Sequence, residues 1–182
     1  MNSSRIAVLG LGNLMRTDDA VGMLALQQLR AHPCFPRTIP LIDGGTLGLD
    51  LLYPLDGVTH LLALDAIDAG APPGTLLRYE GDNIDDLPIA KSVHLLGFSD
   101  LIGALRLIGA APSEIVVLGV QPQAIQWGTQ LTPVVETAMA LLVESAFAQI
   151  VEWTTDTGRA MPLPLPVQVP VLQAAAEESW YW

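Results

Sequence analysis

Short, almost wholly apolar runs alternate along the chain with segments in which apolar residues recur at helical spacing. Uninterrupted apolar runs of this length are typical of strands buried on both faces of a parallel sheet. Five such runs are predicted as strands: 5–10, 38–43, 59–67, 113–120 and, as an edge strand, 74–80. Helices are predicted after Thr17, over 47–55, over 97–109 and from Thr132 onward. The run 59–67 is the strongest strand signal, because only Asp65 breaks its apolar centre.

This alternation of strands and helices predicts the fold class. It favours an α/β domain with a mainly parallel, twisted sheet and helices on both faces. In such sheets, ligands bind beyond the carboxyl ends of the strands. We expect one domain over 1–153 and a proline-rich C-terminal tail over 154–182, where prolines stand at positions 162, 164, 166 and 170.

Charge and cysteine content narrow the class of protein. The formal net charge of −11 argues against binding to nucleic acid or to an anionic membrane surface. A single cysteine, Cys34, excludes an internal disulfide and fits a reducing compartment. The chain opens without a signal-peptide pattern, and no uninterrupted apolar run is long enough to span a bilayer. These features predict a cytoplasmic protein.

The turn after the first predicted strand, GLGNLMRTDDAVG at 10–22, does not fit a nucleotide site. A dinucleotide turn needs a third small residue where this chain has Met15, and it would place phosphates beside Asp18 and Asp19. We therefore expect no organic cofactor. The simpler structural interpretation is a tight glycine turn, a Thr17 cap and acidic residues that favour the start of a helix.

Three side chains are placed for chemistry at the carboxyl edge of the predicted sheet. Asp65 ends the strongest strand, Asp19 follows the first strand, and His94 lies on a connection that can reach the same edge. Two carboxylates and an imidazole form a plausible open site for a first-row divalent metal. His60, at the start of its strand, is interpreted as structural. No serine nucleophile motif is present, and a lone cysteine is usually a packed residue.

The chain resembles the hydrogenase maturation endopeptidases, which process the large subunit of nickel–iron hydrogenases. The resemblance rests on VLGLGNLMRTDDAVG at 8–22, DGGTLGLDLL at 43–52, LLALDAIDAG at 61–70, SVHLLGFSDLI at 92–102 and VLGVQP at 117–122. It spans residues 5 to 153. Each motif is modest alone, but together and in order they are specific.

The resemblance implies a nickel-dependent peptidase. Asp19, Asp65 and His94 would be both the catalytic and the metal-contacting residues, and substrate would contact the two glycine turns through Gly12, Asn13, Asp43, Gly44, Gly45 and Thr46. The enzyme would remove a C-terminal extension from the large-subunit precursor after nickel insertion, recognising nickel that the substrate carries. One departure is that Asp19 stands where many relatives have glutamate, which would shift the metal slightly.

Two points stay open at the level of sequence. The water could be activated by the metal or by a carboxylate such as Asp19 or Asp43. The same three residues would also suit a non-catalytic chaperone that binds the nickel centre of the precursor. The sequence does not identify the hydrogenase, the cleavage position or the oligomeric state.

Overall fold

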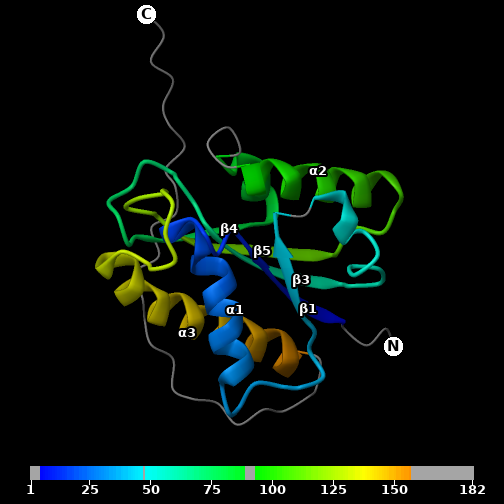
Figure 1. Cartoon of the computed structure of the whole chain (residues 1–182). Coiled ribbons are helices and arrows are strands. Elements are labelled where there is room, and N and C mark those ends of the chain that lie inside the picture. Colours follow the sequence, from blue (N-terminus) through cyan, green and yellow to red (C-terminus); the bar gives the residue numbers. More distant parts are fainter. Residues whose placement is uncertain (1–4, 47, 89–92, 157–182) are drawn as a thin grey trace, which may run out of the picture.

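A five-stranded sheet forms the centre of the molecule in a computed structural model that describes residues 5–46, 48–88 and 93–156 (Figure 1). Its strand order is β2-β1-β3-β5-β4. Four strands run parallel and β4 lies antiparallel to β5 at one edge. This arrangement confirms the predicted α/β fold. The strands are β1 (Ile6–Leu11), β2 (Leu41–Gly45), β3 (His60–Ala66), β4 (Leu76–Glu80) and β5 (Glu114–Val120).

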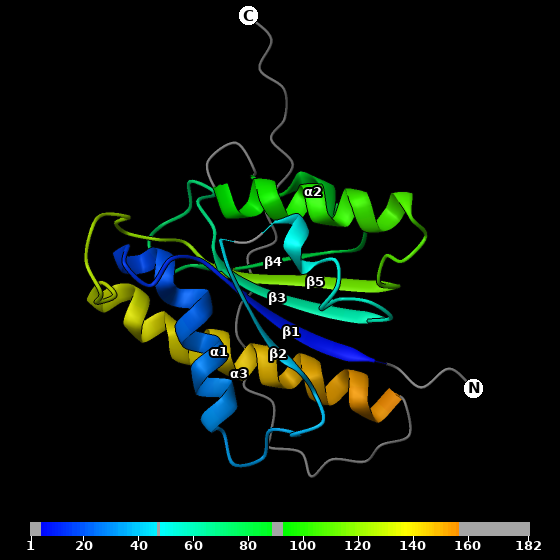
Figure 2. The same cartoon turned by 45° about the vertical axis from the view of Figure 1, so that its right-hand side comes forward.

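Helices cover both faces of the sheet (Figure 2). Helices α1 (Val21–Ala31) and α3 (Pro133–Asp156) pack on one face, and α2 (Val93–Leu107) packs on the other. Successive strand residues point to opposite faces, so Val8 joins the core beneath α1 and α3 while Leu9 joins the core beneath α2. Burial on both faces explains why the central strands β1, β3 and β5 are predominantly apolar.

Most strand ends lie within two residues of the prediction, and three elements show the differences that matter for the site. Strand β2 begins after Pro40 rather than at residue 38 and continues into its two glycines; Pro40 has no N–H to donate to a ladder. The predicted helix over 47–55 is reduced to a short 3-10 turn, η2 (Leu49–Leu51). Helix α2 begins at Val93, four residues before the predicted start at 97.

Helix α3 is long and apolar enough, by length and composition, to cross a membrane. Its packing gives it another role here, because Val135, Leu142, Ala146 and Ile150, which lie along one side of the helix, are fully buried in the core against the sheet. The helix continues to Asp156, so the predicted domain boundary at 153 falls inside it. The remainder of the predicted tail, 157–182, lies outside the described residues.

The start of α1 approaches the sheet closely at Gly22. A Cβ atom on Gly22 would lie 2.2 Å from the carbonyl oxygen of Leu64 and 2.6 Å from that of Leu11. Gly22 therefore allows the close helix–strand contact that a third glycine provides in dinucleotide-binding turns. This explains how Met15 can occupy that third position without disrupting the packing of α1.

Candidate active site

Three predicted site residues meet at the carboxyl edge of the sheet. Asp19 lies on a 3-10 turn, η1 (Thr17–Ala20), between β1 and α1; Asp65 is the penultimate residue of β3; and His94 is in the first turn of α2. The prediction that His94 lies on a connection is wrong, since α2 begins before it. All three side chains are almost inaccessible, with exposed fractions of 7% for Asp19, 0% for Asp65 and 10% for His94.

Asp19 and His94 contact each other directly. The Nε2 atom of His94 lies 2.9 Å from Oδ2 of Asp19. The same oxygen accepts a hydrogen bond from the backbone N–H of Asn13 at 3.2 Å. The turn after β1 therefore holds the Asp19 carboxylate against the imidazole on α2, joining two segments 75 residues apart in the chain.

Two buried polar atoms in this cluster lack a hydrogen-bond partner among the described residues. Asp65 accepts a bond from the backbone N–H of Ala66 at its Oδ1 atom, at 2.8 Å, but its Oδ2 atom has no partner. The Nδ1 atom of His94 is also unpartnered. Buried polar atoms are nearly always paired, and a buried atom left unpaired costs stability. The cluster therefore has unused binding capacity at two positions.

Burial and charge shift the pKa values of two of these groups. Desolvation raises the pKa of Asp65 to about 7, an effect that Asp19 reinforces and that His94 and the Ala66 amide oppose. The hydrogen bond to Asp19 raises the pKa of His94, although burial works against it. Near neutral pH, Asp65 thus changes its protonation state. Perturbed groups of this kind gather at functional sites.

The glycine turn after β1 requires a residue without a side chain. Gly12 has φ of +116°, and a Cβ atom there would lie 1.9 Å from the carbonyl oxygen of Asp19. Its N–H donates to the carbonyl oxygen of Gly45 at 3.0 Å, which places the end of β2 beside the cluster. The side chains of Asp43 and Thr46 are exposed there, and Gly44 is buried. The described contacts include no bond from Asp43 to the three clustered side chains.

The predicted side-chain cap at Thr17 is wrong, whereas Asp18 and Asp19 lie in the first turn of η1, as predicted. Arg16 precedes η1 and Ala20 precedes α1, and neither helix has a side-chain cap. Thr17 instead bonds to the segment after β5, where its Oγ1 atom donates to the carbonyl oxygen of Ala124 at 2.8 Å. Asp18 also faces that segment. These contacts with residues more than 100 positions away could not be inferred from the local sequence, because the same residues also suit a helix cap.

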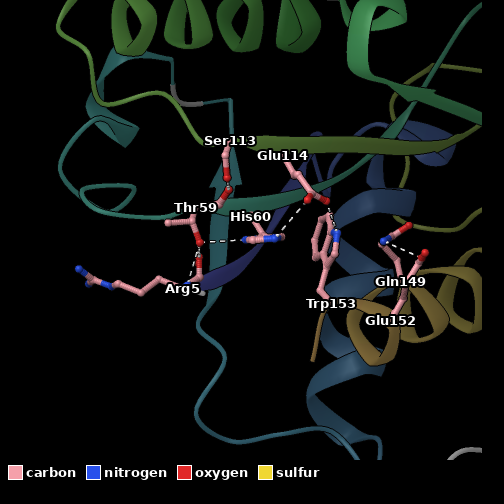
Figure 3. Close-up of polar contacts among 8 residues, drawn as sticks. All are labelled: Arg5, Thr59, His60, Ser113, Glu114, Gln149, Glu152 and Trp153. Atoms are coloured by element: carbon pink, nitrogen blue, oxygen red, sulfur yellow. Dashed lines mark hydrogen bonds and ion pairs between the residues drawn. The ribbon is translucent and has the colours of Figure 1, made fainter. Parts of the chain in front are cut away.

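The opposite edge of the sheet holds a second histidine whose ring nitrogens both have partners (Figure 3). The Nδ1 atom of His60 lies 2.9 Å from Oγ1 of Thr59, and its Nε2 atom lies 3.5 Å from Glu114. Trp153 packs edge-on against the ring. These contacts agree with the interpretation of His60 as a structural residue.

Among the described residues, no three histidine, cysteine or acidic side chains stand in an arrangement ready to hold a metal ion. The direct bond between Asp19 and His94 gives a physical reason, since one potential ligand atom of each is directed at the other. A metal ion that used both atoms would have to replace this bond.

Comparisons with known proteins point to one family. The family model of hydrogenase maturation proteases matches residues 23–149, a range that contains Asp65 and His94 and begins four residues after Asp19. The hydrogenase expression/formation protein HupD of Bradyrhizobium diazoefficiens is 35% identical over 164 residues, which cover 88% of this chain and 85% of that protein. The hydrogenase 2 maturation protease of Escherichia coli is 33% identical over 156 residues, covering 85% of this chain and 93% of that protein.

A solved structure agrees with these relatives. The hydrogenase maturating endopeptidase HybD from E. coli superimposes with a TM-score of 0.75 at 33% identity, covering 85% of this chain and 94% of that one. Fold, sequence and the order of the motifs therefore lead to the same assignment. The chain belongs to the hydrogenase maturation protease family, and as a protease it is a hydrolase.

Proposed function

We propose that the chain cleaves a C-terminal extension from the large-subunit precursor of a nickel–iron hydrogenase, and that the cluster of Asp19, Asp65 and His94 recognises nickel carried by that precursor. The proposal rests mainly on two buried atoms that have no partner among the described residues, Asp65 Oδ2 and His94 Nδ1. They lie beside the hydrogen bond between the ionisable side chains of Asp19 and His94. Carboxylate oxygens and imidazole nitrogens are suitable ligands for a first-row divalent metal.

The absence of a ready-made metal site among the described residues supports recognition rather than storage of the metal. In the protein without substrate, Oδ2 of Asp19 and Nε2 of His94 bind each other, so neither atom is free to hold a metal ion. A nickel ion held by the precursor would exchange that bond for two ligand contacts and would use the unpaired oxygen of Asp65. Binding would then be favourable only when the precursor carries its metal, so specificity becomes a difference of affinities.

The surface beside the cluster suits a polypeptide substrate. Leu14 and Met15 on the turn after β1 have exposed fractions of 40% and 53%, and Trp127 on the segment after β5 is 82% exposed. The N–H of Gly128 donates to the carbonyl oxygen of Met15 at 3.0 Å, so the two segments lie together. Exposed apolar and aromatic side chains are typical of protein–protein contacts. They would contact the precursor near the scissile bond.

The cleavage itself is a peptide hydrolysis. A water molecule gives up a proton to a base as its oxygen attacks the scissile carbonyl carbon, the C–N bond breaks, and a proton is delivered to the departing nitrogen. Burial raises the pKa of Asp65 to about 7, close to neutral pH, which suits proton transfer. Activation of the water by substrate-borne nickel and activation by a carboxylate both agree with this geometry.

The direct test is to incubate the protein with nickel-loaded and nickel-free precursor and to measure the intact mass of each. We expect loss of the extension from the loaded precursor alone. Equal cleavage of both forms would overturn nickel recognition. If neither form is cut but the loaded form binds, the cleavage proposal fails and a chaperone role replaces it.

A further inference from the structure

Asp18 is a fully buried carboxylate to which the proposed cleavage assigns no step. Its exposed fraction is 0%. Its Oδ2 atom accepts hydrogen bonds from the backbone N–H groups of Gln123 and Ala124, both at 2.9 Å, and from Oγ1 of Thr132, also at 2.9 Å. Its Oδ1 atom accepts from the backbone N–H of Thr132 at 2.7 Å. All four donors lie on the segment between β5 and α3.

The donors to Asp18 are neutral, and the described part of the chain provides no Lys, Arg or His ion pair to it. A buried charge without a counter-ion is costly unless several hydrogen bonds compensate. These four bonds close a contact between positions more than 100 residues apart. The carboxylate therefore ties η1 to the segment 123–132, which lie side by side in Figures 1 and 2.

Further bonds hold η1 against the same segment. The N–H of Thr17 donates to the carbonyl oxygen of Gly128 at 2.8 Å, and Oγ1 of Thr17 accepts from the N–H of Gln126 at 3.1 Å. Thr17 has φ of +38°, a conformation that β-branched residues rarely adopt. The contacts with the segment 123–132 therefore impose the shape of the turn.

Asp19 is confined between this contact and the glycine turn. On one side its carbonyl oxygen lies against Gly12, where a Cβ atom would be 1.9 Å away. On the other side it follows Asp18 directly. We propose that Asp18 is a positioning residue: by tying η1 to the segment 123–132, it fixes the Asp19 carboxylate in its contact with His94. The expected effect on cleavage rests on the proposed function, whereas the expected effect on the contact with His94 does not.

The test is Asp18→Asn, which keeps the size of the side chain but replaces one acceptor oxygen with an amide donor facing N–H groups. Because Nε2 of His94 faces the Asp19 carboxylate at 2.9 Å, we expect wild-type protein to show a protected Nε2–H proton in its NMR spectrum. We expect this signal to disappear in Asp18→Asn, and a wild-type spectrum without it would contradict the contact that Asp18 is proposed to fix. We also expect kcat for precursor cleavage to fall by about 10- to 100-fold while KM changes little, because misplacement of a reacting group costs this much.

Two further variants separate positioning from general stability. Thr132→Val removes only the hydroxyl donor; we expect faster exchange of the His94 proton and a smaller fall in kcat than for Asp18→Asn. Glu114→Gln weakens contacts with Trp153 and His60 at the opposite edge, and it should leave the His94 proton unchanged.

A folded Asp18→Asn protein that keeps the His94 proton signal would overturn the inference, whatever its cleavage rate. If Asp18→Asn does not fold, Thr132→Val decides, and an unchanged His94 signal overturns the inference. If the wild-type protein cuts no precursor but the His94 signal depends on Asp18 as expected, the proposed function fails while the positioning role stands.

Discussion

Each of the two edges of the sheet holds an imidazole beside a carboxylate, but the two pairs differ in burial and in how completely they are hydrogen-bonded. At the amino edge, His60 has a partner for both ring nitrogens, and the side chain of Glu114 is 57% exposed (Figure 3). At the carboxyl edge, His94 and Asp19 are almost inaccessible, and one nitrogen of His94 has no partner.

This difference separates a structural pair from the cluster to which we assign the proposed function. The His60 pair has its hydrogen-bonding needs met by its surroundings and by solvent, so it requires nothing further. The cluster at the carboxyl edge buries unsatisfied atoms and a carboxyl group with a raised pKa, which costs stability. A ligand from the substrate would relieve that cost.

The largest expected effect is that of Asp65→Asn on cleavage. The amide keeps the size of the side chain but cannot ionise and binds metal poorly, so we expect cleavage of the nickel-loaded precursor to fall by at least about 100-fold. The measurement is the rate of mass loss of the precursor. Wild-type activity in this variant would remove Asp65 from the site.

The next-largest expected effect is a pH dependence of the free energy of unfolding that comes from the carboxyl edge. The pKa of Asp65 rises from 3.8 to about 7 on folding, so the native state binds its proton more tightly and stability falls as pH rises through this window. The raised pKa of His94 acts in the same direction, since its stabilising contribution is lost as pH rises through the folded-state pKa.

We therefore expect wild-type protein to lose about 3 kcal/mol relative to Asp65→Asn between pH 4 and pH 7. Urea unfolding of both proteins across this range measures the difference. Parallel curves would show that Asp65 titrates normally.

Gly12→Ala tests the tight backbone of the carboxyl edge. The added Cβ would collide with the carbonyl oxygen of Asp19, and we expect a loss of about 3 kcal/mol in the free energy of unfolding. The matched control is Gly103→Ala, an exposed helical position where, apart from its chain neighbours and the backbone of its own helix, nothing lies within 4 Å of the added carbon. It should raise stability by about 0.5–1 kcal/mol. Equal effects of the two variants would contradict the close contact at Gly12.

The smallest effect is expected from Glu114→Gln at the amino edge. The variant loses a partly exposed charge beside His60, and such pairs contribute up to about 1 kcal/mol. Thermal unfolding should show a loss within this limit, and precursor cleavage should match wild type. A large loss of cleavage would mean that the amino edge contributes to function.

The sequence predicted the strands and the place of the cluster because both follow from strong, local patterns. Apolar runs identified β1, β3 and β5, and the rule for the carboxyl ends of parallel strands placed Asp19 and Asp65 together. The role of Asp18 could not be predicted, because its donors lie more than 100 residues away. Similarly, the sequence does not show why a glycine is needed at position 22. The reason is the close approach of α1 to the carbonyl oxygens of Leu64 and Leu11, which only the structure shows.

The most direct test of the account compares His94→Ala with His60→Ala in cleavage of nickel-loaded precursor, followed by intact mass, with a cooperative thermal transition as the check that both variants fold. We expect His94→Ala to lose at least about 100-fold in rate, whereas His60→Ala, at the amino edge where both ring nitrogens have partners, should cut at close to the wild-type rate. Undiminished cleavage by His94→Ala, or an equal loss in both variants, would contradict the assignment of function to the carboxyl edge.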